Sequence, residues 1–421
     1  SLLERLLLTH KWTSGTTTHS ELIIMKTNFL TSSILTLILA TAPLAAQGEW
    51  PTRGWAMTTP PEVGLDAKVL ASFDADIGEG KYGYVDSMLV IRHGKVAYER
   101  YYGHDYERIY SEEASTPGPL VVNDPTGPYN YFNSWWHPYY RESTLHSMQS
   151  VTKSVVSAVI GIAVGRGEFP DLDTPVLSFF EPGEVANVDD RKDRITLRHL
   201  LTMSAGLDWD ENLPYTDPDN TFTIMALSKD WAQFTIDRPM AENPGEVFQY
   251  NSGATLILGQ VFRLATGIDL EEYAVKHLFT PLGIDDYFWK RTPSGLVDTQ
   301  EGLYVTSRDI AKIAYLFLKR GQWDGEQIVP GEWVRASVEP SLSVTDDHSV
   351  QYGYKWWLTH YEYQGKDLVA FAGSGFGGQY PIVLPELDIV LVFTGWNIHS
   401  DRPSLSTREA INRILEAVKE P

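Results

Sequence analysis

The stretch SVTKSVVSAVIGIAVGR, residues 150–166, joins two residues that can carry out chemistry to a strongly apolar segment. Its run of valine, isoleucine and alanine predicts a helix that is buried on most of its surface. Ser150 and Lys153 are spaced i and i+3, so a helical backbone makes their side chains neighbours on one face. The stretch therefore predicts a buried helix with a serine and a lysine side by side at its start.

Such a pair suits nucleophilic catalysis. A serine becomes a good nucleophile when a base removes its proton, and a lysine can be that base only if burial or nearby positive charge lowers its pKa from about 10.4. The apolar helix supplies burial, and its N-terminus offers backbone N–H groups that favour a developing oxyanion. Both residue types are common, however, and an S-x-x-K arises by chance roughly once or twice in a chain of this length. The pair needs support from other parts of the sequence.

Two later motifs provide that support. Tyr250-Asn-Ser252 follows the Pro244-Gly245 turn about 100 residues further on, and Gly373-Ser-Gly375 follows a strand-like run about 120 residues after that. In order, the three motifs match the S-x-x-K, S-D-N or Y-x-N, and K-T-G elements of penicillin-recognising serine enzymes.

The chain resembles the serine hydrolases related to class C β-lactamases over roughly residues 60–420. The segments that carry this resemblance are Leu145–Ser154, His199–Trp209, Phe279–Ile284, Gly302–Asp309 and Tyr352–Trp357. In the form of Tyr250-Asn-Ser252, together with Gly377-Gly-Gln379, it is similar to 6-aminohexanoate-dimer hydrolases and their esterase-like relatives. The resemblance implies a β-lactamase/transpeptidase-like fold with no cofactor and no metal.

The resemblance also implies a role for each motif residue. Ser150 would be the nucleophile, Lys153 its proton acceptor, and Tyr250 a second proton-transfer group, since a phenol near an ammonium loses its proton more easily. The oxyanion hole would combine the N–H of Ser150 with one N–H from the segment Ser374–Phe376. The residues expected to bind the oxyanion or the substrate are Ser150, Ser252, Gly373, Ser374, Gly375 and Phe376.

Two positions depart from the family pattern. Gly373 replaces the usual Lys or His, so the cation that would hold the carboxylate of a β-lactam or of a terminal D-alanine is missing. Ser252 replaces a common Asn and leaves a hydroxyl, rather than an amide, to hold a substrate carbonyl. Both changes favour a small neutral ester, amide or peptide-like substrate, although a cation from elsewhere in the chain could compensate.

The leading hypothesis is an exported serine hydrolase that cleaves ester or amide bonds through an acyl-enzyme on Ser150. Two alternatives with the same fold stay open. One is a class C-like β-lactamase or D-alanyl-D-alanine carboxypeptidase, and the other is a non-catalytic sensor that binds peptidoglycan or another ligand. A dinucleotide site at Gly373-x-Gly375-x-x-Gly378 is disfavoured, because a strand rather than a helix is predicted after it.

Composition excludes several other functions. The 421-residue chain has 34 Lys+Arg against 55 Asp+Glu, a formal net charge of −21, and no cysteine. The acidic excess argues against nucleic-acid binding, which depends on basic residues that neutralise phosphate. A chain without cysteine has no disulfides, thiolate metal sites or thiol nucleophiles. Its 11 histidines show no metal-binding spacing, so no metal is expected.

The first 46 residues are predicted to be absent from the working protein. Met25-Lys26, an apolar run of about 14 residues from Phe29 to Ala42, and Leu44-Ala-Ala46 are typical of a secretory signal peptide, residues 25–46. The run is shorter than the roughly 20 residues of a membrane span, so no stable span is expected. Residues 1–24 begin without Met and are interpreted as sequence upstream of the true start. The predicted location is periplasmic or secreted, and the sequence does not indicate an oligomeric state.

The rest of the chain has strand-like segments at both ends. A hairpin is predicted at Asp86–Tyr102, with Gly94 in its turn. Further strands are predicted at Leu368–Ala372, Gln379–Leu384 and Ile389–Thr394, and helices at residues 152–166, 197–203, 221–234, 254–266, 270–278, 307–319, 332–338 and 404–419. We therefore predict an α/β fold with an antiparallel sheet flanked by helices. Residues 47–145 and 340–421 would form this α/β domain, and residues 146–339 an inserted α-rich domain that carries the S-x-x-K helix.

Residues 104–142 form an unusually long connection that is rich in aromatic side chains. Long loops inside compact domains are often functional covers, but the rings could equally serve to pack the loop onto the surface. The sequence leaves both interpretations open.

Overall fold

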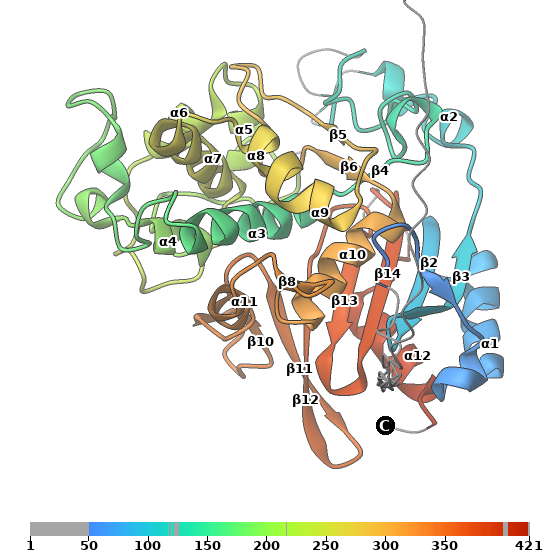
Figure 1. Cartoon of the computed structure of the whole chain (residues 1–421). Coiled ribbons are helices and arrows are strands. Elements are labelled where there is room, and N and C mark those ends of the chain that lie inside the picture. The colour runs from blue at the N-terminus through green and yellow to red at the C-terminus, as the bar shows by residue number, and fades with distance from the viewer. Residues whose placement is uncertain are drawn as a thin grey trace, which may run out of the picture. The chain divides into compact units, whose positions relative to one another are not determined.

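Strands from both ends of the described chain meet in one nine-stranded sheet. The structure is a computed structural model that describes residues 50–116, 118, 120–121, 126–215, 217–398 and 403–419. In spatial order the strands are β1 (Ala56–Met57), β3 (Lys95–Tyr101), β2 (Val85–Arg92), β14 (Ile389–Gly395), β13 (Tyr380–Leu384), β12 (Lys366–Ala372), β11 (Trp357–Tyr363), β10 (Val350–Tyr352) and β9 (Leu342–Ser343). In Figure 1 the blue β2 therefore stands beside the red β14, although their residues are far apart in the sequence.

The sheet is mixed, whereas the sequence predicted an antiparallel one. Every neighbouring pair is antiparallel except β1 and β3, which run parallel with Ala56 opposite Lys95. β1 is only two residues long, too short to show any periodicity, and this is why the sequence does not reveal it. The predicted hairpin is present as β2 and β3, and its turn residues His93 and Gly94 both have positive φ, 52° and 72°. This is the backbone of a type I′ turn, which matches the twist of the two strands.

The central strands are buried on both faces. Leu89 and Ile91 of β2 belong to a core that also contains α3 (Thr152–Gly165) and α10 (Ser307–Leu318). Met88 and Val90, which point to the other face, pack with α1 (Ala67–Gly78) and α12 (Thr407–Ala417). Because helices cover both faces, β2 and β14 have no exposed residue, and the stretches Met88–Ile91 of β2 and Ile389–Phe393 of β14 are continuously apolar.

The helices between the two halves of the sheet surround α3. They are α4 (Leu197–Leu201), α5 (Thr221–Ala226), α6 (Trp231–Ile236), α7 (Ser252–Thr266), α8 (Leu270–Ala274), α9 (Thr280–Leu282) and α11 (Gly331–Ser337). The helix predicted at 221–234 is in fact two helices, because Asp230 caps a new N-terminus with a hydrogen bond from Gln233 N–H. The helix predicted at 270–278 changes after Ala274 into a π-helical turn, Val275–Phe279.

The remaining short elements complete the described chain. Two small sheets consist of β4 (His146–Ser147), β6 (Leu303–Val305) and β5 (Phe288–Trp289), and of β7 (Gln322–Trp323) and β8 (Glu326–Gln327). A short helix α2 (Tyr106–Ile109) lies in the long connection. The 3-10 helices are Pro60–Val63, Glu113–Ser115, Tyr140–Glu142, Gln149–Val151, Val176–Phe179, Lys192–Arg194 and Pro385–Leu387. The division into two domains stays a prediction.

The aromatic connection packs onto the end of β14. His137 stacks on Trp396 with ring centroids 4.8 Å apart, and the Trp396 indole N–H donates to the Tyr131 carbonyl at 2.8 Å. Tyr110 donates its hydroxyl hydrogen to the Trp396 carbonyl, also at 2.8 Å. The rings therefore anchor this segment to the sheet, and Tyr131 also contacts Phe376 of the third motif.

The predicted signal peptide and upstream segment, residues 1–46, lie outside the described residues. In the part of the chain that the structure describes, none of the helices has the length and apolarity needed to cross a bilayer.

We expect Leu391→Ala to lower the free energy of unfolding by about 2–5 kcal/mol, because Leu391 is fully buried in β14 between two layers of side chains. Leu264→Ala is the matched control, since Leu264 is 49% exposed and should change stability by no more than about 0.5 kcal/mol. Urea-induced unfolding measures both. Equal losses would contradict the placement of β14 at the centre of the core.

Candidate active site

Ser150 lies in a strained turn directly before α3. The turn is the 3-10 helix Gln149–Val151, and buried Gln149 has a φ of 49°, a conformation that is uncommon for a residue other than glycine. The Gln149 side-chain amide donates to Ser147 Oγ at 2.9 Å and helps to hold this geometry. The Ser150 N–H finds no acceptor among the described residues, so it is free to meet a ligand.

Lys153 is in the first turn of α3 and is only 1% exposed. Its Nζ donates to Ser150 Oγ at 2.8 Å and to the Gln300 carbonyl at 2.9 Å. The structure thus brings the predicted serine and lysine into direct contact, at a distance that suits proton transfer between them.

Tyr250 reaches the same place from the start of α7. Asn251 is the N-cap of this helix, and its side chain accepts a hydrogen bond from Ala254 N–H at 3.0 Å. The cap fixes the start of the helix and thereby the position of Tyr250, the residue before the cap. Lys153 Nζ lies 5.2 Å from the centre of the Tyr250 ring, close enough for a cation–π contact. The Trp357 ring stacks on the Tyr250 ring, with ring centroids 5.7 Å apart.

The third motif, Gly373–Gly375, is in direct contact with the turn that carries Ser150. A Cβ atom at Gly375 would come within 2.5 Å of the Met148 carbonyl oxygen, so only glycine fits there. A Cβ at Gly373 would lie 3.3 Å from the methyl groups of Val151 and 3.1 Å from Pro381, so a cationic side chain at this position would require both to move. Close approach of the Met148 backbone thus explains Gly375, and close side-chain packing by Val151 and Pro381 disfavours a larger residue at position 373.

The same segment offers N–H groups for an oxyanion. The N–H groups of Gly373 and Gly375 donate across the hairpin to Pro381 and Gln379, at 3.0 and 2.9 Å. Because bonding directions alternate along an extended chain, the N–H groups of Ser374 and Phe376 point away from that hairpin, and neither has an acceptor in the described part of the chain. These two N–H groups are therefore the candidates for the second oxyanion donor that the sequence predicted.

Ser252 has a different environment from the one that the sequence suggested. Its backbone N–H and its hydroxyl both donate to the Glu211 carboxylate, at 2.7 and 2.8 Å, and the residue is 2% exposed. The hydroxyl expected to hold a substrate carbonyl is therefore engaged within the protein. Trp209 Nε1 adds a third hydrogen bond to Glu211 at 2.7 Å. Sequence reasoning missed Glu211, which lies two residues after the recognised stretch that ends at Trp209 and belongs to no spacing motif.

Glu211 and a second buried lysine shape the electrostatics of the site. Burial raises the pKa of Glu211, although the positive charge of Lys153 and the hydrogen bonds from Ser252 and Trp209 oppose the shift. Burial lowers the pKa of Lys355 well below its ordinary value, and the charge of Lys153 adds to that effect. Lys355 Nζ donates to the Leu200 carbonyl at 2.6 Å.

An acidic loop behind Lys153 holds the Gln300 carbonyl in place. Asp298 Oδ1 accepts hydrogen bonds from the backbone N–H groups of Gln300 and Glu301, both at 3.2 Å. Tyr129, from the aromatic connection, donates to Asp298 Oδ2 at 3.0 Å. Burial and the neighbouring Glu301 carboxylate raise the pKa of Asp298 to about 6. The loop was also missed, since its residues bear no recognisable motif.

A protein-family model described as Beta-lactamase matches residues 84–411. The chain belongs to the beta-lactamase family. It is 25% identical over 301 residues to the 6-aminohexanoate-dimer hydrolase of Paenarthrobacter ureafaciens, which covers 67% of this chain and 72% of that protein. It is 28% identical over 233 residues to esterase EstB of Burkholderia gladioli, which covers 53% of this chain and 51% of that protein.

A solved structure supports the same conclusion about the fold. EstCE1, a hydrolase with promiscuous acyltransferase activity, has a TM-score of 0.61 and 16% identity to this chain, over 84% of this chain and 98% of EstCE1. The predicted β-lactamase/transpeptidase-like α/β fold is thus confirmed, and the chain is a serine hydrolase of the beta-lactamase family. Among the residues that the structure describes, no three His, Cys, Asp or Glu side chains are grouped to hold a metal ion.

We expect Glu211→Gln to make the folded state relatively more stable at neutral pH and to lower the activity. A carboxyl group whose pKa is raised by folding stabilises the folded state below its unfolded pKa, near 4.5, and loses that contribution as pH rises through the folded-state value. The stability of the variant relative to wild type should therefore increase between pH 4.5 and pH 7, while ester turnover falls as the charge beside Lys153 is lost. Urea unfolding at both pH values and kcat measure this.

The matched control for this substitution is Glu339→Gln, because Glu339 is an exposed carboxylate paired with Arg335 on the surface. A stability difference between Glu211→Gln and wild type that stays constant between the two pH values would contradict a raised pKa for Glu211.

Proposed function

We propose that the protein is an exported hydrolase that cleaves a neutral ester or amide bond through an acyl-enzyme on Ser150. One observation carries this proposal: Lys153 Nζ lies 2.8 Å from Ser150 Oγ and 5.2 Å from the centre of the Tyr250 ring, in a site walled by the third motif. A nucleophile, a base and a second proton-transfer group are thus present together.

In acylation, the amine of Lys153 takes the proton of Ser150 Oγ while the Gln300 carbonyl holds the amine in position. The Ser150 oxygen attacks the carbonyl carbon of the substrate and forms a new C–O bond. The π electrons of the carbonyl move to its oxygen, which becomes negatively charged. The N–H of Ser150 and one N–H from Ser374 or Phe376 would stabilise that oxyanion.

Collapse of the tetrahedral intermediate expels the alcohol or amine. Tyr250 would donate its phenolic proton to this leaving group and recover a proton from Lys153, which leaves an ester on Ser150. A water molecule then repeats the sequence: its proton passes to Tyr250 and Lys153, it attacks the ester, and Ser150 regains its proton as the acid product departs. The cycle consumes one water and needs no cofactor.

The chemistry beside the nucleophile favours a neutral scissile group. Position 373 itself carries no cationic side chain, and the Ser252 hydroxyl is hydrogen-bonded to Glu211. The names of the relatives, an esterase and a 6-aminohexanoate-dimer hydrolase, are consistent with this substrate class. The β-lactamase and carboxypeptidase alternatives lack the cation that their substrates need. A non-catalytic sensor would not require the contact between Ser150 and Lys153.

Export rests on the sequence alone. The basic and apolar segment at residues 25–46 supports a signal peptide, and the absence of cysteine is compatible with a periplasmic or secreted location.

Ser150→Ala should abolish turnover of a short-chain p-nitrophenyl ester, whereas the wild type should release a stoichiometric burst of p-nitrophenol, because the alanine variant has no oxygen to acylate. Stopped-flow absorbance measures the burst, and mass spectrometry of the quenched enzyme detects the acyl adduct. Ser294→Ala, at an exposed serine, is the matched control and should retain the burst. Equal activity of Ser150→Ala and the wild type would refute the proposal.

A cephalosporin should be hydrolysed slowly relative to an activated ester, with kcat/KM lower by at least about 10²-fold, since no cation at Gly373 holds the carboxylate next to the lactam. Nitrocefin and p-nitrophenyl acetate, assayed under the same conditions, provide the comparison. Comparable values for the two substrates would favour the β-lactamase alternative.

A further inference from the structure

His146 and Asp86 form a buried pair directly before the turn that carries Ser150. His146 lies in β4 and Asp86 in the central strand β2, and their side chains are 2% and 0% exposed. His146 Nε2 is 2.9 Å from Asp86 Oδ2. Tyr106, from the aromatic connection, donates its hydroxyl hydrogen to Asp86 Oδ1 at 2.8 Å. The pair thus joins the sheet and the long connection to the strand that leads to the nucleophile.

The partners of the His146 ring determine where its hydrogens lie. Nδ1 is 2.9 Å from the Ser147 carbonyl oxygen, which can only accept, so Nδ1 carries a hydrogen and donates it. Nε2 then faces the Asp86 carboxylate, and these two acceptors would repel each other without a proton between them. One proton is therefore shared between His146 and Asp86, and hydrogen bonds fix the ring on both sides.

Ser147 connects the pair to the strained turn. Its carbonyl accepts from His146, and its hydroxyl accepts from the Gln149 side-chain amide at 2.9 Å. Gln149 has the uncommon φ of 49° and directly precedes Ser150. A residue keeps such a conformation only where the surrounding structure holds it. These contacts therefore hold the backbone that places Ser150 next to Lys153.

We propose that His146 and Asp86 are positioning residues of the hydrolase, which fix the Ser150 turn through the Ser147 carbonyl. Their role is to keep the geometry in which the Ser150 hydroxyl meets its base. A small displacement of a reacting group from that geometry strongly lowers the rate of the chemical step. The inference rests on the proposed hydrolase function and adds to it two residues that belong to none of the three sequence motifs.

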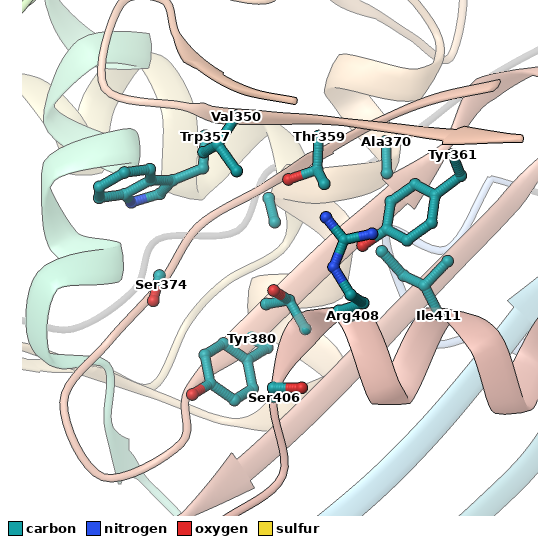
Figure 2. A pocket seen from close by; sticks show the side chains of 12 residues that line it. Val350, Trp357, Thr359, Tyr361, Ala370, Ser374, Tyr380, Ser406, Arg408 and Ile411 are labelled. Atoms are coloured by element: carbon teal, nitrogen blue, oxygen red, sulfur yellow. The ribbon is translucent and has the colours of Figure 1, made fainter. Parts of the chain in front are cut away.

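The pair should affect turnover more than substrate binding. The hydrogen bonds of the His146 side chain go to Asp86 and Ser147, on the side of the turn that faces β2. Ser374 of the third motif and Trp357 line a separate cavity of about 290 Å³, and no member of the pair takes part in that lining (Figure 2). Loss of the pair should therefore lower kcat and leave KM nearly unchanged.

Three variants separate the contacts of the pair. His146→Gln places an amide nitrogen near the position of Nε2, so it keeps the bond to Asp86 and loses the bond to the Ser147 carbonyl. Asp86→Asn keeps both bonds of a neutral imidazole, because the asparagine amide donates to Nε2. Tyr106→Phe removes only the third hydrogen bond of Asp86, and it is the milder variant that decides the matter if His146→Gln does not fold.

The matched control is a surface pair with the same separation. His360 Nδ1 lies 2.9 Å from Asp367 Oδ2, and the two side chains are 33% and 64% exposed. His360→Gln should leave kcat within about twofold of wild type. All proteins are assayed with a short-chain p-nitrophenyl ester, and kcat is divided by the folded fraction from near-UV circular dichroism. A purely structural role would lower the folded fraction and leave this normalised kcat unchanged.

We expect His146→Gln to lower the normalised kcat at least about tenfold, with KM within about twofold of wild type. Asp86→Asn should lose less than about threefold, and Tyr106→Phe about two- to fivefold. The positioning role is overturned if His146→Gln has the normalised kcat of wild type, raises KM instead, or loses no more than Asp86→Asn. An unchanged kcat for Tyr106→Phe overturns it where His146→Gln does not fold. Absence of ester turnover and of an acyl adduct in the wild type would instead refute the proposed hydrolase function.

Discussion

A lysine amine that is 1% exposed needs hydrogen-bond acceptors around it, because a buried polar or charged group without partners is strongly destabilising. Lys153 finds two, the Ser150 hydroxyl and the Gln300 carbonyl. The first is the atom that the amine would activate. The second belongs to a loop held by Asp298, which in turn is bonded by Tyr129 from the aromatic connection. The position of the base thus depends on three segments that are distant in sequence.

The second constraint is the close approach of two backbones. Gly375 lies so near the Met148 carbonyl that a Cβ atom cannot be accommodated, and this contact places the end of β12 against the turn that carries Ser150. The N–H groups of that turn and of the third motif are brought together only by this approach. Catalytic geometry in this fold is therefore a property of the interface between the sheet and α3.

Charge is distributed unevenly around the reacting centre. Near Ser150, the Glu211 carboxylate accepts two hydrogen bonds from Ser252, and its negative charge opposes the lowering of the Lys355 pKa. The overall negative charge of the chain does not predict this arrangement, because recognition depends on local groups rather than on net charge.

The sequence by itself determined the S-x-x-K helix, which runs over Thr152–Gly165 close to the predicted 152–166, as well as the β2–β3 hairpin and the strands next to β14. Each of these rests on local periodicity, turn chemistry or a short motif, which neighbouring residues encode. Tertiary structure alone decided the parallel edge strand β1 and the partners of Ser252. It also brought Glu211 and the Gln300 carbonyl to Ser252 and Lys153. Contacts between segments far apart in the chain create these arrangements, and no local pattern records which segments will meet.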